Sequence, residues 1–393
     1  MAWWPHMSRR ICFVTGSRAD YGHLSSVIEA TQAHGDLTLQ IVVTGQHLDP
    51  RFGKTWTAIV DDGYAIDDKV DLALGDDTPL ATAQAVGRGV AALAESFNRL
   101  SPDIVVVLGD RFEIFAAAQA SLLLNIPLAH IHGGEATEAA VDDAIRHAIT
   151  KMARLHFCAA EPYSARVKQM GEDPAHVFTV GAPGLDGIET LDYMSREDLG
   201  VELAVDLSGS LFVITYHPVT LDLDKGATSI AALTDALGCF DEAAMVFTGV
   251  NSDPGNRIIS ETLAAFVAQD SQKRVTVTSL GQQRYLSALR EADVVIGNSS
   301  SGLIEAPAFG KPTVNIGDRQ KGRLSADSVI DCGNDAAAIQ SAIQTALDPD
   351  FRTSASQTNP PYGRGGAAAK IVSILSSIDV ARLSTKPFHD IMP

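Results

Sequence analysis

The feature that most constrains the fold is a short apolar run, rich in β-branched residues, that ends abruptly and recurs along the whole chain. In the first half these runs are residues 11–16, 39–45, 103–110, 126–134, 155–160 and 176–183. Most are separated by longer stretches with helical periodicity, namely residues 21–34, 81–100, 112–124 and 142–154. Continuous apolar strands that alternate with helices predict a parallel sheet covered by helices on both faces.

The second half repeats this pattern, with apolar runs at residues 211–218, 243–249, 274–280, 293–300, 312–317 and 328–333. We therefore predict an α/β protein with two doubly wound domains, over residues 8–185 and 205–360. The acidic, weakly periodic residues 184–210 are predicted to contain the hinge. A helix near residues 367–377, within a C-terminal segment at 361–380, is expected to pack back onto one domain, with the first as a candidate.

Composition limits the partners of this chain. Of its 393 residues 46% are hydrophobic, and 48 acidic residues outnumber 30 basic ones to give a formal charge of -18. Such a charge opposes binding to nucleic acid or anionic lipid, although a few donors in one cleft can still bind a small anion. The four cysteines have no paired spacing and no run reaches membrane-spanning length. We expect a cytoplasmic protein that binds neither nucleic acid nor membranes.

Polar motifs follow many of the predicted strands. They occupy residues 16–22, 108–113, 130–135, 181–184, 216–220, 297–302 and 317–323. Ligands of a doubly wound sheet bind beyond the carboxyl ends of its strands, where helix N-termini also present N–H groups. Two sets of strand-end loops therefore predict a deep cleft between the domains.

Taken singly, most of these motifs have two interpretations. Asp110 and Arg111 fit a substrate site, and they also fit a helix-start carboxylate beside a surface arginine. Asp142 and Asp143 open a predicted helix and can simply complement its dipole, with Arg146 one turn later.

Two cofactor hypotheses receive little support from the spacing of the candidate residues. His130 and His132 have strand spacing and so are expected to share a face, either as a metal pair or as two hydrogen-bonded polar residues. A metal is not predicted, because no further ligands stand at compatible positions. Gly87, Gly89 and Ala92 follow a helical segment rather than a strand, so NAD is not predicted either.

The serine-rich loop at residues 297–302 is more informative. It follows a buried strand and places small residues and several hydroxyls at a helix start, which favours phosphate binding over a simple helix cap. Arg319, after the next strand, can supply a bidentate clamp, and Arg18 in the first strand-end loop can add a second cation.

Seven motifs, taken in order along the chain, resemble those of the hydrolysing UDP-N-acetylglucosamine 2-epimerases. They are GSRADYG, VTGQHLDPRFG, LGDRFEIFAAA, HIHGGE, DDAIRHAITKMARLHF, YHPVT and GNSSSGLIEAPAFGKPTVNIGDRQKGR. The resemblance covers residues 10–380. It implies the GT-B fold of two Rossmann-like domains, a UDP-linked N-acetylated hexosamine substrate, no cofactor, and a homodimer or homotetramer. Apolar residues 116–124 are compatible with a buried subunit contact.

The resemblance also implies roles for individual residues. The nucleotide and substrate contacts it implies are Arg18, Asp20, Arg111, His132, Arg146, Ser299, Ser300, Gly302, Glu305 and Arg319. The catalytic residues it implies are Asp110, Glu135, Asp142 and His217. Glu135 is included because some relatives have Glu where this chain has His132. His217 is a candidate donor to the leaving group, and it also fits an ordinary hydrogen-bonded histidine.

The implied reaction begins with cleavage of the C1–O bond, which makes the C2 proton acidic enough for a carboxylate. Elimination gives UDP and a 2-acetamidoglucal, and hydration with inversion at C2 gives N-acetylmannosamine for nonulosonic (sialic-type) acid synthesis. A UDP-linked 2,4-diacetamido-2,4,6-trideoxyhexose, a precursor of legionaminic acid, is an alternative substrate. A GT-B glycosyltransferase and a non-catalytic nucleotide-sugar sensor are the alternatives from other classes.

Overall fold

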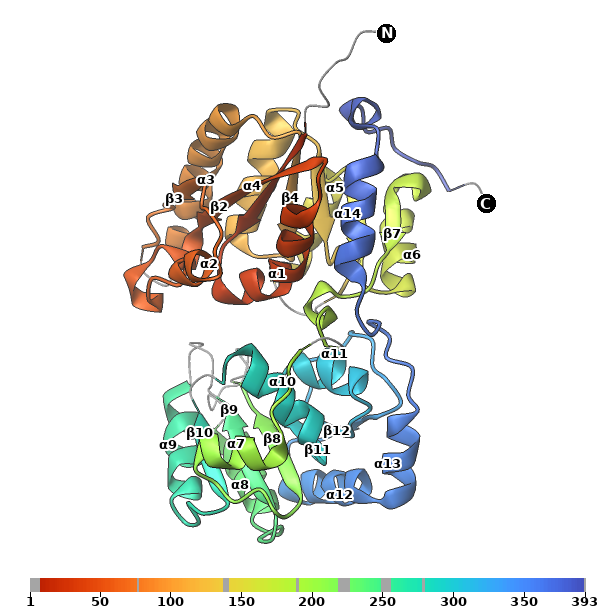
Figure 1. The fold of residues 1–393 in the computed structure, drawn as a ribbon. Helices are drawn as coiled ribbons and strands as arrows, with labels where there is room; N and C mark the ends of the chain where they lie inside the picture. Colours follow the sequence, from red (N-terminus) through yellow and green to blue (C-terminus); the bar gives the residue numbers. More distant parts are fainter. Residues whose placement is uncertain are drawn as a thin grey trace. The chain divides into compact units, whose positions relative to one another are not determined.

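The computed structural model describes residues 8–75, 78–136, 141–188, 191–217, 227–248, 256–277 and 280–391. The chain divides into two compact units (Figure 1). Unit 1 comprises Met1–Gly187 and Arg364–Pro393, and unit 2 comprises Ile188–Gly363.

Among its described residues, unit 1 contains a parallel sheet of seven strands in the order β3-β2-β1-β4-β5-β6-β7. The strands are β1 (Arg9–Thr15), β2 (Leu37–Thr44), β3 (Asp68–Val70), β4 (Ile104–Leu108), β5 (Leu128–Ile131), β6 (Leu155–Cys158) and β7 (Val177–Thr179). The chain runs outward from β1 in one direction and from β4 in the other, so the strand order reverses between them. Such a switch point places a crevice at the carboxyl ends of these two strands.

Helices cover both faces of this sheet. They are α1 (Arg18–Ala33), α2 (Thr57–Asp61), α3 (Pro79–Leu100), α4 (Phe112–Leu123), α5 (Val141–Met152), α6 (Glu161–Gln169) and α14 (Ala367–Ser377). Alternate residues of β1 serve different cores: Phe13 packs in the cluster that contains α1 and α14, and Val14 in the cluster that contains α3 and α4. Both sides of the strand are apolar because both are buried.

Helix α14 joins unit 1 from the far end of the chain. It contacts α1 (Figure 1). Ile371 and Leu375 of α14 are fully buried in the core that the two helices share. The Asp186 carboxylate accepts hydrogen bonds from the amides of Ala367 at 2.8 Å and Ala368 at 2.5 Å. A carboxylate at this end satisfies amides that have no partner within the helix and complements the helix dipole.

The described part of unit 2 contains a six-stranded parallel sheet in the order β10-β9-β8-β11-β12-β13. Its strands are β8 (Leu211–Thr215), β9 (Ala244–Thr248), β10 (Arg274–Val277), β11 (Val294–Gly297), β12 (Thr313–Ile316) and β13 (Val329–Cys332). Its helices are α7 (Arg196–Leu203), α8 (Ala227–Leu237), α9 (Asn256–Val267), α10 (Gly281–Glu291), α11 (Ser301–Ala308), α12 (Ala336–Leu347) and α13 (Pro349–Ser356). Here the strand order reverses between β8 and β11.

The structure differs from the sequence prediction in two elements. The edge strand β3 was not predicted, and the stretch expected to contain the hinge includes helix α7, which contacts α10. The side chain of Ser195 caps α7, because its Oγ accepts a hydrogen bond from the amide of Asp198 at 3.1 Å. Within the described ranges, no helix has both the length and the apolar character needed to cross a membrane.

The chain ends in a segment that we call the C-terminal strap, residues 380–391. The Leu383 side chain is buried, and its carbonyl accepts a hydrogen bond from Arg154 at 2.5 Å. Lys386 Nζ donates to the carbonyls of Thr150 at 3.1 Å and Lys151 at 2.6 Å, and lies 2.6 Å from Glu172 Oε2. The strap therefore binds the C-terminal end of α5, where cations are favourable.

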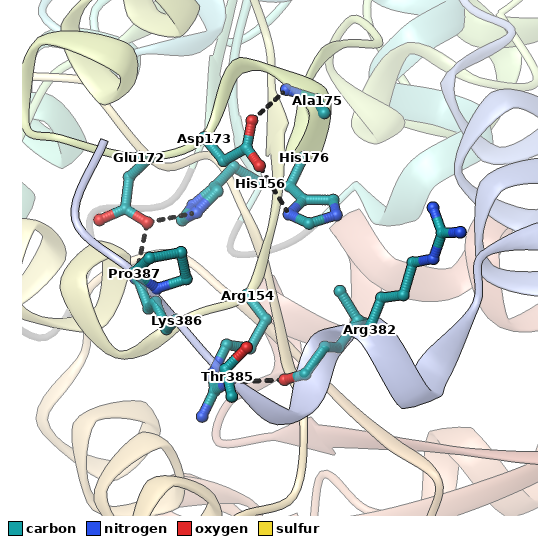
Figure 2. A pocket seen from close by; sticks show the side chains of 11 residues that line it. Arg154, His156, Glu172, Asp173, Ala175, His176, Arg382, Thr385, Lys386 and Pro387 are labelled. Atoms are coloured by element: carbon teal, nitrogen blue, oxygen red, sulfur yellow. Dashed lines mark hydrogen bonds and ion pairs between the residues drawn. The ribbon is translucent and has the colours of Figure 1, made fainter. Parts of the chain in front are cut away.

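The strap also lines a cavity of about 310 Å³ (Figure 2). In Figure 2 the side chains of Arg154, His156, Glu172 and Lys386 are among those that surround this cavity. Arg154 and His156 lie at the start of β6, so the cavity is at the amino ends of the strands. The polar strand-end motifs lie at the opposite edge.

Candidate active site

A buried charged cluster lies where β1 and β4 end. Glu113, in the first turn of α4, has a fully buried side chain whose Oε1 accepts a hydrogen bond from Arg111 Nε at 2.6 Å. A Cβ at Gly16 would lie 2.3 Å from Glu113 Cγ. The glycine at the end of β1 therefore leaves the space that this carboxylate occupies. Glu113 was not singled out from the sequence.

Asp20 belongs to the same cluster. Its side chain is buried at the start of α1, and its amide donates to the Ser17 hydroxyl at 3.3 Å. Burial raises the pKa of Asp20 to about 7, against the opposing effect of Arg111 and with a further increase from Glu113. This carboxyl group therefore changes its charge near neutral pH.

Three of the predicted site residues meet at the end of β4 and the start of α5. Arg146 Nη2 donates to Asp110 Oδ2, and the side chains are 5% and 20% exposed. Asp142 lies one turn before Arg146, and burial together with the nearby charge of Asp110 raises its pKa. Asp110 is bonded to the guanidinium of Arg146, and the carboxyl group of Asp142 beside it holds its proton more tightly. This arrangement suits acid–base chemistry.

The ring of His130 is hydrogen-bonded below this site. Its Nε2 donates to the Gly109 carbonyl at 2.8 Å, and its Nδ1 lies 3.2 Å from Thr150 Oγ1. Burial lowers its pKa to about 3, so the ring is neutral and holds the turn that precedes Asp110. No group of three or more His, Cys, Asp or Glu side chains in the described part of the chain is arranged to bind a metal ion.

His132 has a different environment from His130. The expected strand alternation does not reach it, because β5 ends at Ile131 and the φ angle of His132 is +64°. Its Nδ1 lies 2.6 Å from Glu135 Oε1, so the two predicted residues form a hydrogen-bonded pair. A left-handed backbone at a residue other than glycine costs about 1–3 kcal/mol, so the surroundings of His132 must hold it in place.

In unit 2, Asn298 connects the predicted nucleotide loops. Its Oδ1 accepts from the His217 amide and its Nδ2 donates to the His217 carbonyl, both at 2.8 Å. Its carbonyl accepts from Arg319 Nη1 at 3.0 Å and Gln320 Nε2 at 2.8 Å. Asn298 is fully buried and was not singled out from the sequence, although it lies inside the serine-rich motif.

Glycines allow the serine loop to follow β11 closely. Gly297 has a φ of +137°, and a Cβ there would lie 1.9 Å from the Thr215 carbonyl oxygen. Gly302 is buried, and a Cβ there would lie 2.9 Å from Thr313 Cγ2, so its role includes packing of α11 on β12.

The remaining predicted nucleotide residues lie on helix starts. Ser299 and Ser300 are partly exposed just before α11, and Glu305 follows within this helix. Hydroxyls at a helix start suit an anion. In unit 1, Arg18 is exposed at the first residue of α1. Each unit thus presents part of the predicted residue set at the carboxyl ends of its strands.

Comparison with known proteins identifies the family. A family model described as UDP-N-acetylglucosamine 2-epimerase matches residues 29–376. The chain is 39% identical over 323 residues to the GDP/UDP-N,N'-diacetylbacillosamine 2-epimerase (hydrolyzing) of Campylobacter jejuni, covering 82% of this chain and 84% of that protein. It is 35% identical over 385 residues to the Escherichia coli polysialic acid biosynthesis protein P7, covering 98% of each.

A solved structure supports the fold. The crystal structure of UDP-GlcNAc 2-epimerase from Neisseria meningitidis bound to UDP-GlcNAc aligns with a TM-score of 0.79 at 18% identity, over 93% of this chain and 99% of that one. The two parallel sheets and this alignment confirm the predicted α/β fold of GT-B type. On the family match and the two relatives, this chain belongs to the UDP-N-acetylglucosamine 2-epimerase family.

Proposed function

We propose that this hydrolysing nucleotide-sugar 2-epimerase acts on a UDP-linked 2,4-diacetamido-2,4,6-trideoxyhexose and releases UDP and the free sugar inverted at C2. The 39% identity to the Campylobacter jejuni enzyme supports this substrate, because N,N'-diacetylbacillosamine is a sugar of that type. UDP-N-acetylglucosamine is the second candidate, supported by the similarity to a protein named for polysialic acid synthesis.

The observation that carries the proposed chemistry is the group formed by Asp110, Asp142 and Arg146. The C2 proton of the sugar is not acidic until the C1–O bond begins to break and positive charge develops at C1. Asp110, which accepts a hydrogen bond from Arg146, is the proposed base at C2. Asp142, whose pKa is raised, can exchange a proton with the bound sugar or with water.

The leaving diphosphate requires preorganised positive charge. We assign this role in unit 2 to Arg319 and to the serine loop that precedes α11, with Glu305 binding the ribose hydroxyls. In unit 1 we assign it to Arg18, which is exposed and so accessible to a ligand. The electron pair of the C1–O bond leaves with UDP as the C1=C2 bond forms, and water then adds at C1.

The test uses the two UDP-sugars in separate reactions in deuterated water, followed by NMR. We expect release of UDP and a free sugar that carries deuterium at C2, with the faster initial rate for the diacetamido sugar. Asp110→Asn is expected to lower kcat by about 10²–10⁴-fold while UDP binding measured by calorimetry remains. An intact UDP-sugar would indicate a glycosyltransferase or a sensor instead, and protium retained at C2 would exclude this route.

We also propose that the enzyme is a homodimer or homotetramer. Within the apolar segment 116–124, Ala116, Ala117, Ala118 and Ala120 are fully buried inside unit 1, so a subunit contact from this segment is proposed for its C-terminal end. Leu122, Leu123 and Leu124, at the end of α4, are 41%, 76% and 38% exposed and support a smaller apolar contact.

A further inference from the structure

His132 and Glu135, in the loop that follows β5, form a pair that none of the steps above uses. Glu135 Oε1 lies 2.6 Å from His132 Nδ1, with the carboxylate side chain 5% exposed and the imidazole 14% exposed. Since the carboxylate accepts the Nδ1 proton, Nε2 is the ring atom available to exchange a proton with a ligand. The pair therefore presents an oriented imidazole.

The backbone holds this imidazole firmly. The His132 amide donates to the Phe157 carbonyl of β6 at 3.0 Å, and the left-handed φ of His132 turns the chain away from the strand. A Cβ at Gly134 would lie 2.4 Å from the Tyr163 carbonyl oxygen, so the loop packs against α6. Such a conformation persists only where its surroundings impose it.

His132 follows the strand end next to the one that precedes the proposed base. Strands β4 and β5 pair with Leu108 opposite Ile131, and the Gly109 amide donates to the Ile131 carbonyl at 3.0 Å. Asp110 and His132 therefore follow neighbouring strand ends. Inversion at C2 needs a proton removed from one face of the sugar and another delivered to the opposite face, which two separate groups can do.

We propose that His132 is a catalytic residue, the general acid that protonates C2 of the unsaturated intermediate, and that Glu135 is its positioning residue. The hydrogen bonds divide the roles: Asp110 accepts from Arg146, whereas His132 is bonded through Nδ1 to Glu135 and presents Nε2 for delivery of a proton. The Nε2 proton moves to C2 and the C1=C2 pair forms the new C–H bond. A water oxygen then bonds to C1 and its proton restores the imidazolium.

This assignment rests on the proposed function, and its test isolates the second half of the reaction. The 2-acetamidoglucal, matching the preferred sugar, is supplied together with UDP, and its hydration is followed by NMR. His132→Gln is expected to hydrate it at least about 10²-fold more slowly than the wild type. With UDP-sugar as substrate, His132→Gln should still release UDP close to the wild-type initial rate while the glucal accumulates.

The conservative variants separate proton transfer from a structural role. Glu135→Gln keeps an acceptor for Nδ1–H but loses the charge, so hydration should slow by about tenfold. His132→Glu should hydrate the glucal faster than His132→Gln. The pH at which its hydration rate changes should move toward the titration range of carboxyl groups. His176→Gln, at the cavity of Figure 2, is the matched histidine control and should change neither the hydration rate nor its pH profile.

Other groups near the pair are distinguishable by their titration. His130 on β5 has a pKa lowered by burial to about 3, and the Cys158 thiol of β6, near Glu135, has one raised by burial to about 12. Asp20 has a pKa of about 7, so its titration could change the hydration rate over the same pH range as an imidazole. Asp20→Asn is therefore measured in parallel.

Two results would overturn the assignment. One is a His132→Gln enzyme that hydrates the glucal at the wild-type rate with an unchanged pH profile. The other is a His132→Gln enzyme that releases no UDP and accumulates no glucal, since His132 would then act before the intermediate forms. A wild-type enzyme that releases no UDP from either sugar contradicts the proposed function itself, and the assignment falls with it.

Discussion

Two histidines at the end of β5 differ in chemistry because their hydrogen-bond partners differ. His130 is bonded to the Gly109 carbonyl and near the Thr150 hydroxyl, and burial lowers its pKa to about 3, so it stays neutral. His132 has a carboxylate on Nδ1 instead. Their spacing in the sequence does not distinguish them, and only the partners that the fold brings to each ring separate His130 from the proposed proton donor His132.

Asp20 yields a prediction about stability and pH. Burial, the largest cause, raises its folded-state pKa from 3.8 to about 7, so the protonated form is favoured in the folded protein. Its contribution to stability is complete below the unfolded value and is lost as pH rises through about 7. Asp20→Asn is neutral at every pH. The melting temperature of this variant minus that of the wild type should therefore increase by a few degrees from pH 5 to pH 8.

Thermal unfolding of the ligand-free protein at both pH values measures this effect. Asp318→Asn, at an exposed position in unit 2, is the control and should show no such difference. If Asp20→Asn and the wild type keep the same difference in melting temperature at pH 5 and pH 8, Asp20 is already ionised in the folded protein at pH 5.

At the scale of elements, α5 is held at both ends. Its first turns carry Asp142 and Arg146, and its last carbonyls accept hydrogen bonds from Lys386 of the C-terminal strap. Glu172, which pairs with Lys386, also pairs with Lys151 and with His156 at 3.0 Å. The strap therefore contacts the helix that carries Asp142, one of the proposed acid–base residues.

Lys386→Met is expected to lower the free energy of unfolding by about 1–3 kcal/mol, because it removes the donor that these carbonyls share with the buried Glu172. Equilibrium denaturation in urea measures the change. Arg382→Ala, on the same strap but 83% exposed, should change it by less than about 0.5 kcal/mol. Equal effects of the two substitutions would show that the strap contributes no specific hydrogen bonds.

Elements with strong periodicity were predictable, and those defined by tertiary contacts were not. The last helix occupies residues 367–377 as expected because its apolar spacing is regular. The strand β3 has three residues and too short a pattern to detect. Helix α7 lies in an acidic stretch without clear periodicity, so its Ser195 cap was the remaining local signal.

The candidate site likewise contains residues that could be proposed from the sequence and residues that only tertiary contacts reveal. Asp110 and Asp142 could be proposed from the sequence because one follows a strand and the other opens a helix, where ligands of such sheets bind, and because the resemblance to the family implies their roles. Glu113 and Asn298 were missed because their importance depends on contacts distant in sequence. Glu113 fills the space beside Gly16, and Asn298 binds the backbone of His217, 81 residues away.

At the scale of the whole molecule, the charge of -18 contrasts with the cations that the proposed sites place at strand ends. Overall charge limits which macromolecules can bind, whereas a few converging donors decide whether a diphosphate can. Self-association of such a chain relies on uncharged surface, and the three leucines at the end of α4 supply some of it.

Leu123→Glu should therefore reduce the oligomeric state, because two charges would be buried where two apolar side chains meet. Analytical ultracentrifugation is expected to give a dimer or tetramer for the wild type and a smaller species for the variant. Val201→Glu, on the similarly exposed Val201 of α7, is the control and should leave the mass unchanged. A monomeric wild type would contradict the proposal.

The return of α14 to unit 1 has a consequence for biosynthesis. Ribosomes deliver the chain from its amino end, so the segment that forms unit 2 emerges before residues 367–377 are translated. Until then the nascent first unit lacks Ile371 and Leu375, and the apolar side of α1 stays exposed to the surrounding proteostasis machinery. A premature stop codon just before Ala367 would thus damage the amino-terminal half of the gene product more than the half next to the truncation.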